Sequence, residues 1–431
     1  MLVAILLISL MVFIAMGLPI AIALAGSSLL YLLVGFATGE VAIPEVVVIH
    51  RMVNGVDSFP LLAVPFFIMA GNLMNTAGIT KRIYDFALAV VGWLRGGLGH
   101  VNVIGSVIFA GMSGTAIADA GGLGTIEIKA MRDHGYDVNF SVGITAASST
   151  IGPIIPPSLP MVIYGVVGGV SIGQLFTAGI IPGLVMAGFM MGMVTLYAYR
   201  RGWGPDAEFS LCNLWVALKL AWMPLMTPVI IMGGMVFGVF TPTEAAVAAC
   251  AYALLLGFGV YRTLGWRQLV RVSMDTIETT AVVLFIVAGA SIFGWILATT
   301  RVTEAFSEAL LSLTRDPIMI LLLINVLLLI VGCFMETIAA ITILTPVLLP
   351  IVTQVGVDPV QFGLIMVLNL MIGLLTPPVG MVLYILTRVA NISFEQCVRA
   401  CAPFIIPLLL ALAVITYWPA VTLWLPTLIF R

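Results

Sequence analysis

The fold of this chain is decided by a stretch that occurs twice. Residues 111–158 contain, in order, GMSGTAIAD, GYD and IGPIIPPS, and residues 332–379 contain GCFMETIAA, GVD and IGLLTPPV at the same spacing. With a constant offset of 221 residues, the two windows are identical at 11 of 48 positions. The identities include three glycines, an aspartate and both prolines of each PP pair. Such residues rarely coincide by chance in apolar segments, so the chain contains an internal repeat.

Each copy of the repeat interrupts an apolar region with residues that end helices. A break in a membrane helix frees backbone N–H and C=O groups, which cost several kcal/mol each if they stay unpaired. Breaks of this kind survive where they line a cavity. Paired breaks in the two halves of a chain point to the binding site of a transporter. The repeat therefore predicts one broken transmembrane helix in each half, close to a substrate site.

The composition places the chain in a membrane. Of 431 residues, 62% are hydrophobic and 8% are charged, and the mean hydropathy is +1.21. A soluble domain carries about 25% charged residues. Apolar runs of about 20 residues recur along the chain, and each is long enough to cross ~30 Å of hydrocarbon. We expect an all-α polytopic membrane protein.

Several other classes of function are excluded by composition and motif. The formal charge of −2 and the lack of a basic cluster give no indication of nucleic-acid binding. The five cysteines form no Cys-x-x-Cys pair, and the three histidines have no metal-ligand spacing. The sequence contains no HExxH, no GxSxG and no P-loop motif. We expect no enzymatic activity and no organic cofactor.

A polar linker at residues 200–208 separates two repeats, each with a re-entrant helical hairpin followed by a broken helix. The expected bounds are residues 1–205 for repeat one, with the hairpin at 99–132 and the broken helix at 139–168, and residues 209–431 for repeat two, with the hairpin at 317–354 and the broken helix at 360–388. The hairpin tips are expected at 113–115 and near 332–337, where glycine interrupts the apolar pattern.

The remaining segments are expected to be spans or amphipathic arms. Residues 40–57 and 262–275 mix charged and apolar side chains, which is typical of a helix that lies along a membrane face. We expect a separate span at 277–298 after the second arm, and one last span at 398–428.

The distribution of basic residues predicts the orientation of the repeats. If the linker is cytoplasmic, 13 of the 17 Lys and Arg residues lie on the cytoplasmic side. The other four are Arg51, Arg301, Arg315 and Arg431. This asymmetry follows the positive-inside rule. It predicts two inverted repeats, with both termini outside, hairpin one entering from the cytoplasm and hairpin two from outside.

The hairpin tips and helix breaks are candidate sodium sites. Free carbonyls at the end of a half-helix, together with hydroxyl and amide oxygens, suit a hard monovalent cation. Hydroxyls that only bond back to their own helix are the alternative. The candidate Na⁺ ligands are Ser113, Thr115, Ser148, Ser149 and Gly152 in repeat one, and Gly332, Thr337, Asn369, Gly373 and Thr376 in repeat two.

A substrate is expected between the two tips, near the middle of the membrane. The candidate substrate residues are Ser113, Asp119, Arg301, Glu336, Pro157 and Pro378. A carboxylate deep in a membrane indicates function, but Asp119 and Glu336 are each equally placed to cap a helix. Arg301 could pair with a substrate carboxylate or anchor the chain at the interface.

One further acid, Glu244, has a structural explanation. The sequence from Thr241 to Glu244 reads TPTE, which places Thr at the N-cap, Pro at the first helical position and Glu at the third. This order predicts a capping box rather than a binding site.

Four motifs together resemble one family. GMSGTAIAD at 111–119, IGPIIPPS at 151–158, FTPTEAA at 240–246 and LLTPPVG at 374–380 are similar to the large membrane subunit of tripartite ATP-independent periplasmic (TRAP) transporters. The resemblance covers essentially the whole chain. It implies an elevator mechanism, in which hairpins and broken helices form a mobile transport domain and the other spans form a scaffold.

The same resemblance implies function and partners. It implies Na⁺-coupled uptake of an organic acid, such as a C4-dicarboxylate or sialic acid, across the bacterial inner membrane. A periplasmic binding protein would deliver the substrate, and a small four-span membrane subunit would join the large one. Since the chain starts at an expected span of the large subunit, we expect the small subunit on a second polypeptide.

Two other classes remain open. A single-component ion-coupled carboxylate symporter would share the broken helices but need no partner. An ion channel would need a continuous polar pore, whereas the polar residues here gather at two breaks. The sequence does not distinguish between substrates.

Overall fold

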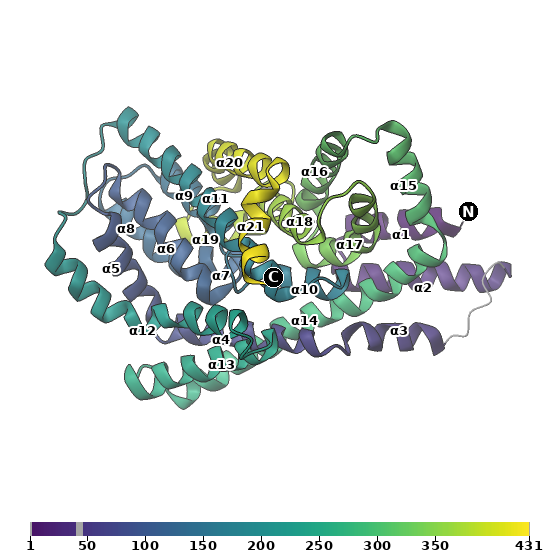
Figure 1. Cartoon of the computed structure of the whole chain (residues 1–431), viewed down its shortest axis with the longest axis horizontal. Coiled ribbons are helices and arrows are strands. Elements are labelled where there is room, and N and C mark those ends of the chain that lie inside the picture. Colours follow the sequence, from purple (N-terminus) through teal and green to yellow (C-terminus); the bar gives the residue numbers. More distant parts are fainter. Residues whose placement is uncertain (1, 40–45, 431) are drawn as a thin grey trace.

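The computed structural model describes residues 2–39 and 46–430, and this part of the chain folds almost entirely into helices (Figure 1). Its only strand-like feature is an isolated antiparallel bridge between Arg95 and Pro205. Nine helical segments in the described part are long and apolar enough to cross a membrane. The expected all-α, multi-spanning architecture is confirmed.

The chain begins with two antiparallel helices and a shorter one. Helices α1 (Leu2–Ala15) and α2 (Ile20–Thr38) pack against each other, and α3 (Val46–Val56) follows. Helix α3 forms the described part of the first expected arm, whose residues 40–45 lie outside the described residues. A single 3-10 turn, η1 (Phe59–Leu62), then leads into α4 (Ala63–Thr76).

Hairpin one, defined here as α6 to α8, lies where the repeat predicts it. After α5 (Ile79–Val91), helix α6 (Gly97–Ser113) ends at Gly114, which has a φ of +62° and adopts the left-handed conformation that glycine allows. The chain returns through α7 (Ala116–Ala118), the π-helical turn η2 (Asp119–Leu123) and α8 (Gly124–Asp133).

Broken helix one consists of α9 (Val138–Ser149) and α10 (Leu159–Gly168). Break one, residues 150–158, contains three prolines, Pro153, Pro156 and Pro157, which lack an N–H group and therefore cannot continue the helix. Helix α11 (Ile172–Arg201) then crosses back towards the linker.

The second half contains the same succession of elements. Helices α12 (Leu211–Val236) and α13 (Pro242–Leu254, continued by the π-helical turn η3, Leu255–Val260) precede α14. Helix α15 (Val302–Leu313) comes next. Hairpin two consists of α16 (Pro317–Phe334) and α17 (Thr337–Gln354), and broken helix two of α18 (Pro359–Gly373) and α19 (Met381–Ala390). Each half therefore contains a pair of helices followed by a helix that is interrupted at a PP pair.

Two expected boundaries were wrong. Residues 266–275 of the expected arm and the span at 277–298 are one uninterrupted helix, α14 (Trp266–Thr299), because no proline occurs between them. Its 34 residues extend about 51 Å at 1.5 Å per residue. The single span expected at 398–428 is two helices, α20 (Phe394–Tyr417) and α21 (Pro419–Ile429). Pro419 disfavours helical dihedrals at the preceding residue, Trp418, where the helix stops.

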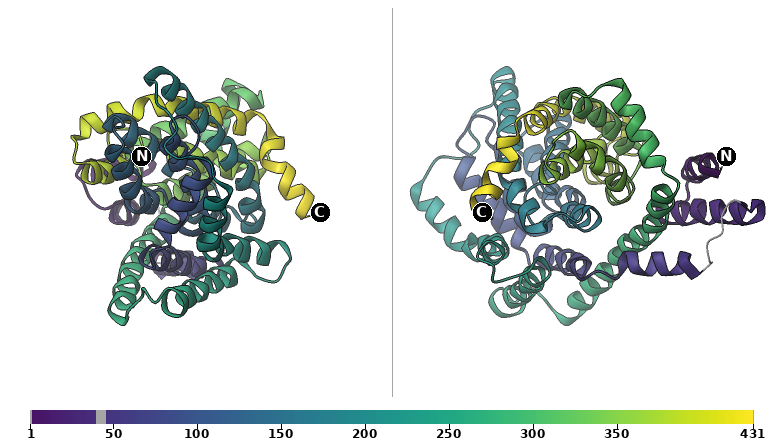
Figure 2. Two further views of the ribbon diagram at one scale, coloured as in Figure 1. Left: turned by 90° about the vertical axis from the view of Figure 1, so that its left-hand side faces the viewer. Right: turned by 45° about the vertical axis from the view of Figure 1, so that its right-hand side comes forward.

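The helices form two groups that lie side by side. Helix α14 packs against α2, α3, α4 and α17, and α13 packs against α4, along one edge of the molecule (Figures 1 and 2). The hairpins and broken helices pack together above that edge, with α16 and α17 against α18, and α6 and α20 against α9. The broken helices lie innermost, since every residue of α18 from Val360 to Gly373 is buried. The helices that lead into both breaks therefore end inside the protein, although Pro377, Pro378 and Val379 of break two are exposed.

Candidate functional site

The tip of hairpin one, Ser113 to Thr115 (tip one), touches break one. A Cβ atom at Gly114 would overlap the backbone carbonyl of Pro157, and the Leu159 N–H donates to the Gly114 carbonyl at 3.4 Å. A Cβ atom at Gly152 would lie 3.4 Å from the Thr115 carbonyl oxygen. The close approach needs glycine at position 114. The predicted meeting of the first tip with the first break is confirmed.

Tip two, Met335 and Glu336, and the end of α16 meet break two (residues 374–380) in the same way. A Cβ atom at Gly332 would lie 3.3 Å from Gly373 Cα, and a Cβ atom at Gly373 would overlap the backbone of Gly332. The Val379 N–H donates to the Cys333 carbonyl at 3.2 Å. Each hairpin is therefore held against its own broken helix by backbone contact, which leaves carbonyl oxygens close together.

Side chains at equivalent repeat positions begin the returning helix of each hairpin. Thr115 Oγ1 accepts from the Ala118 N–H at 3.2 Å. Glu336 Oε2 accepts from the Ile338 and Ala339 N–H groups at 2.9 and 3.1 Å. Glu336 is therefore a helix cap, one of its two predicted roles, whereas the cap of the first returning helix is Thr115 and not Asp119. The capping box at Thr241 and Glu244 is also confirmed.

Behind each tip, an asparagine on the outgoing arm of the hairpin bonds to the broken helix. In hairpin one, Ser148 Oγ donates to Asn102 Oδ1 at 2.6 Å, and Asn102 Nδ2 donates to Glu127 Oε2 at 2.6 Å and to Thr145 Oγ1 at 2.8 Å. In hairpin two, Asn369 Nδ2 donates to Asn325 Oδ1 at 2.8 Å. Ser148 and Asn369 occupy the same repeat position, so the two halves use equivalent contacts.

Three candidate sodium ligands have buried oxygens with no hydrogen-bond partner in the described part of the chain. They are Ser113 Oγ, Thr337 Oγ1 and Asn369 Oδ1. Unpaired buried polar atoms are rare in folded proteins and require an explanation. Three other predicted hydroxyl ligands donate to nearby acceptors: Ser148 to Asn102 Oδ1, Ser149 to the Ala146 carbonyl at 2.7 Å and Thr376 to the Ile372 carbonyl at 2.7 Å. A hydroxyl that donates keeps lone pairs available for a cation.

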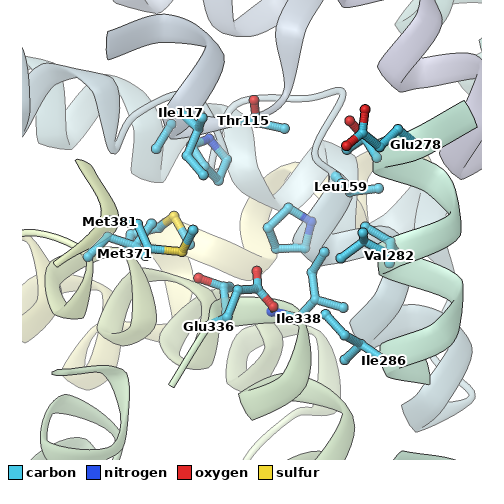
Figure 3. Close-up of a pocket in the computed structure, with 17 residues that line it drawn as sticks. Thr115, Ile117, Leu159, Glu278, Val282, Ile286, Glu336, Ile338, Met371 and Met381 are labelled. Carbon is cyan, nitrogen blue, oxygen red and sulfur yellow. The ribbon is translucent and has the colours of Figure 1, made fainter. Parts of the chain in front are cut away.

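A cavity of about 400 Å³ opens between the two tips (Figure 3). Both tips contribute to it, through Thr115 and Ile117 on one side and Glu336 and Ile338 on the other. The half-helices after the breaks and one face of α14 complete the wall, with the further lining residues Ala116, Pro153, Leu159, Pro160, Glu278, Thr279, Val282, Val283, Ile286, Thr337, Met371, Leu374 and Met381. The volume is within the usual range for a small-molecule site.

Some of the candidate substrate residues lie at the cavity or at tip one, and the others lie away from both. Glu336 lines the cavity, and Ser113 and Pro157 lie at the contact between tip one and break one. Asp119 lies at the start of η2, is 1% exposed and is not part of the wall. Pro378 is exposed in break two.

Arg301 does not reach the cavity. Its side chain is 81% exposed and lies 3.8 Å from Glu304, measured from Nε to Oε2. The structure therefore provides no contact between Arg301 and a molecule in the cavity, and its position at the start of α15 resembles an anchor at the surface.

Two acidic residues at the site are not among those predicted from the sequence. Glu127, 1% exposed, lies within hairpin one, and Glu278 faces the cavity from α14 (Figure 3). Glu127 could have been noticed as a lone acid on a hairpin arm. Glu278 had no comparable signal, because the expected end of the arm at 275 placed it at the very start of a span.

Comparisons with known proteins decide the family. The family model described as the tripartite ATP-independent periplasmic transporter, DctM component, matches residues 7–421. The chain belongs to this family. The sialic acid TRAP transporter large permease protein SiaM of Vibrio cholerae is 46% identical to it over 412 residues, which cover 96% of this chain and 95% of the relative. The C4-dicarboxylate TRAP transporter large permease protein DctM of Rhodobacter capsulatus is 34% identical over 427 residues, 96% of each chain.

A solved structure supports the fold of this DctM component. The YdaH transporter of Alcanivorax borkumensis matches with a TM-score of 0.58 at 16% identity, covering 86% of this chain and 87% of that one. At this identity the likeness concerns the fold alone. The chain is thus a multi-pass transporter permease and not an enzyme, and the family expected from its motifs is confirmed.

Proposed function

We propose that this DctM component is the transporting subunit of a TRAP complex that takes up an organic acid together with Na⁺. Two similar permeases are named for acids, sialic acid in one case and C4-dicarboxylates in the other. The proposed substrate site is the cavity between the two hairpin tips, where residues from both halves of the chain converge.

The observation that carries the proposal is the set of three unpaired buried oxygens among the predicted Na⁺ ligands, of which Thr337 belongs to the cavity wall. Ser113 Oγ belongs to tip one, Thr337 Oγ1 follows tip two, and Asn369 Oδ1 lies on α18. A desolvated oxygen without a donor is costly, and a bound cation would remove that cost.

We propose two Na⁺ sites, one in each half. In the first, oxygens of Ser113, Thr115, Ser148, Ser149 and Gly152 would surround the ion, and in the second, oxygens of Gly332, Thr337, Asn369, Gly373 and Thr376. All the side-chain ligands are neutral, and backbone carbonyls freed at the breaks supply the rest. Each ion would stabilise the tip against its break and thereby prepare the cavity for substrate.

The transport movement is proposed to be of the elevator type. The hairpins and broken helices would move together as one unit, since each tip is in backbone contact with its break. The group around α2, α4, α13 and α14 would form the scaffold. We also propose that the two halves are inverted repeats.

The proposed complex contains a small four-span membrane subunit and a periplasmic binding protein, and it lies in the bacterial inner membrane. These partners follow from the family name, which describes a tripartite periplasmic transporter. A single-component symporter and an ion channel are the alternatives.

Uptake into proteoliposomes tests the proposal. The complete complex with its binding protein should accumulate a labelled acid when Na⁺ is higher outside, and accumulation should stop when choline replaces Na⁺. Uptake of the acid at the same rate with and without a Na⁺ gradient would contradict the proposed coupling of uptake to Na⁺. The chain reconstituted without partners should show no uptake. Robust uptake by the chain alone would identify a single-component symporter, and rapid passive flux of small ions would identify a channel.

A further inference from the structure

The wall of the cavity is acidic, although the proposed substrate is itself an acid. Its charged residues are Glu278 and Glu336, and the described lining residues include no Lys, Arg or His (Figure 3). Neither carboxylate takes part in the ion pairs that the described residues form, which join Arg201 to Asp137 and Arg301 to Glu304. The protein side of the cavity therefore carries two formal negative charges.

The two carboxylates are held differently. Glu336 Oε2 accepts two backbone N–H groups at the start of α17, so its position is fixed by the helix. Glu278 stands on α14 beside Thr279, Val282, Val283 and Ile286, and these neighbours form the rest of the α14 wall. Figure 3 shows Glu278 and Glu336 on separate walls of the cavity, one on α14 and one at tip two. A molecule between the tips would meet an acceptor-only group on each side.

We propose that this cavity selects an organic acid that has one anionic group and several hydroxyl or ammonium groups, and that Glu278 is the residue on α14 that accepts hydrogen bonds from those donors. The inference rests on the proposed function, because it assumes that an organic acid binds between the tips. Beyond the proposed function, the inference names the class of acid that binds and identifies Glu278 as the residue that distinguishes this class from acids with two carboxylates.

The physical reason is the difference between a donor and a second carboxylate at the same place. A hydrogen bond from a hydroxyl to an ionised carboxylate is about twice as strong as one between neutral groups. A second carboxylate beside Glu278 would instead meet a like charge, and such repulsion is a common means of rejecting a wrong ligand. The anionic group of the substrate would point away from both Glu278 and Glu336, towards the Na⁺ site proposed at tip one.

Direct binding to the membrane complex tests this inference without the selectivity of the binding protein. The chain with its small membrane subunit, in nanodiscs with Na⁺, is titrated by calorimetry with N-acetylneuraminate, gluconate and glycerate. Each of these has one carboxylate and several hydroxyls. Succinate, with two carboxylates and no hydroxyl, is the comparison. We expect at least one hydroxylated acid to bind about tenfold more tightly than succinate.

The matched variants are Glu278→Gln and Asp275→Asn. Glu278→Gln should weaken binding of the hydroxylated acid about tenfold and should not weaken binding of succinate. Asp275 lies on the same helix, is exposed and is not part of the cavity wall, so Asp275→Asn should bind like the wild type. The melting temperature of each complex shows that the variants fold.

The outcomes separate the two proposals. If the wild type binds none of these acids in Na⁺, the proposed function is contradicted. If acids bind, but Glu278→Gln has the wild-type preference, or succinate binds as tightly as the best hydroxylated acid, the role of Glu278 is overturned while the proposed function stands.

Discussion

Asn102 joins three elements of the first half through one amide group. It accepts from Ser148 on α9 and donates to Glu127 on α8 and to Thr145 on α9. All four side chains are buried, and none is more than 2% exposed. A buried polar group that loses its partner costs more than the bond contributed, because its desolvation is then uncompensated. The amide therefore ties hairpin one to its broken helix.

Removing this amide should destabilise the protein. Asn102→Ala leaves Glu127, Thr145 and Ser148 without this partner, at about 1–3 kcal/mol for each unsatisfied group. We expect a clear drop in the melting temperature of the purified protein in detergent. Asn54→Ala is the control, since Asn54 bonds only to His50 on an exposed part of α3. If Asn102→Ala has the melting temperature of the wild type, the hydrogen bonds of Asn102 do not contribute to the stability of the protein.

Two hydroxyls test the proposed sodium sites. Ser148→Ala and Thr376→Ala should each raise the Na⁺ concentration for half-maximal uptake by about five- to tenfold, because loss of one neutral ligand costs about 1 kcal/mol. Expression of Thr376→Ala should stay normal, because the Thr376 hydroxyl donates to its own helix, whereas Ser148→Ala also removes the donor to Asn102, so the melting temperature of each variant is measured with its Na⁺ dependence. The control is Thr353→Ala, whose hydroxyl is exposed and donates to its own helix. If both variants keep the Na⁺ dependence of the wild type, the breaks are structural kinks and do not bind Na⁺ through these hydroxyls.

At the scale of elements, the contact between α16 and break two depends on two glycines. Gly332 and Gly373 approach so closely that a side chain at Gly373 would overlap the Gly332 backbone. Backbone cannot move aside as the end of a long side chain can, so the hairpin would have to shift.

Gly373→Ala should therefore separate hairpin two from broken helix two. We expect destabilisation of about 1–3 kcal/mol, typical of an overpacked contact, and loss of the stabilisation that Na⁺ confers on the wild type. Melting curves with and without Na⁺ measure both effects. Gly192→Ala on α11 is the matched control, since a Cβ atom there meets nothing within 4 Å. If Gly373→Ala retains the Na⁺-dependent shift, this contact does not form part of the ion site.

Helix α14 shows how one element links distant parts of the chain. It starts in the segment expected to be an arm and continues without interruption through the span, packing on α4 at one place and on α17 at another. This continuity holds the residues from Glu278 to Ile286 along one wall of the cavity. A kink after residue 275 would have pointed Glu278 elsewhere.

At the scale of the whole molecule, basic residues lie at both ends of its long axis. Helices α5 and α8, which contain Lys81, Arg82, Lys129 and Arg132, lie at one end in Figure 1. Helix α15, which Arg301 and Arg315 flank, lies at the other end with the N-terminus. These six basic residues therefore lie towards two opposite ends of the molecule, and which end faces the cytoplasm stays a prediction from the positive-inside rule.

Cysteine accessibility tests the predicted orientation. In a cysteine-free background, Pro205→Cys in the linker should react with a membrane-impermeant maleimide only after the cells are opened, and Phe430→Cys should react in intact cells. Opposite labelling is expected because the linker is predicted to be cytoplasmic and the C-terminus outside. Labelling of both positions from the same side would refute the predicted topology.

The sequence alone determined where the membrane helices break. Gly114, the PP pairs at 156–157 and 377–378, and the Asp caps at Asp137 and Asp358 act within one turn of the chain. Their effect on backbone geometry is local, so it could be predicted without knowing the neighbours. The repeat then indicated that each tip meets its own break, and the structure confirms both meetings.

Only the tertiary structure decided which side chains face the cavity and which network supports the tips. Glu278 and tip two are about 60 residues apart in sequence and become neighbours through the packing of α14 on α17. Asn102 reaches Glu127 and Ser148 only because three helices converge, and Arg301, predicted as a substrate residue, is instead exposed. Local residue patterns determine where a helix ends. Side-chain partners depend on the relative positions of several helices, and those positions follow from packing over the whole fold.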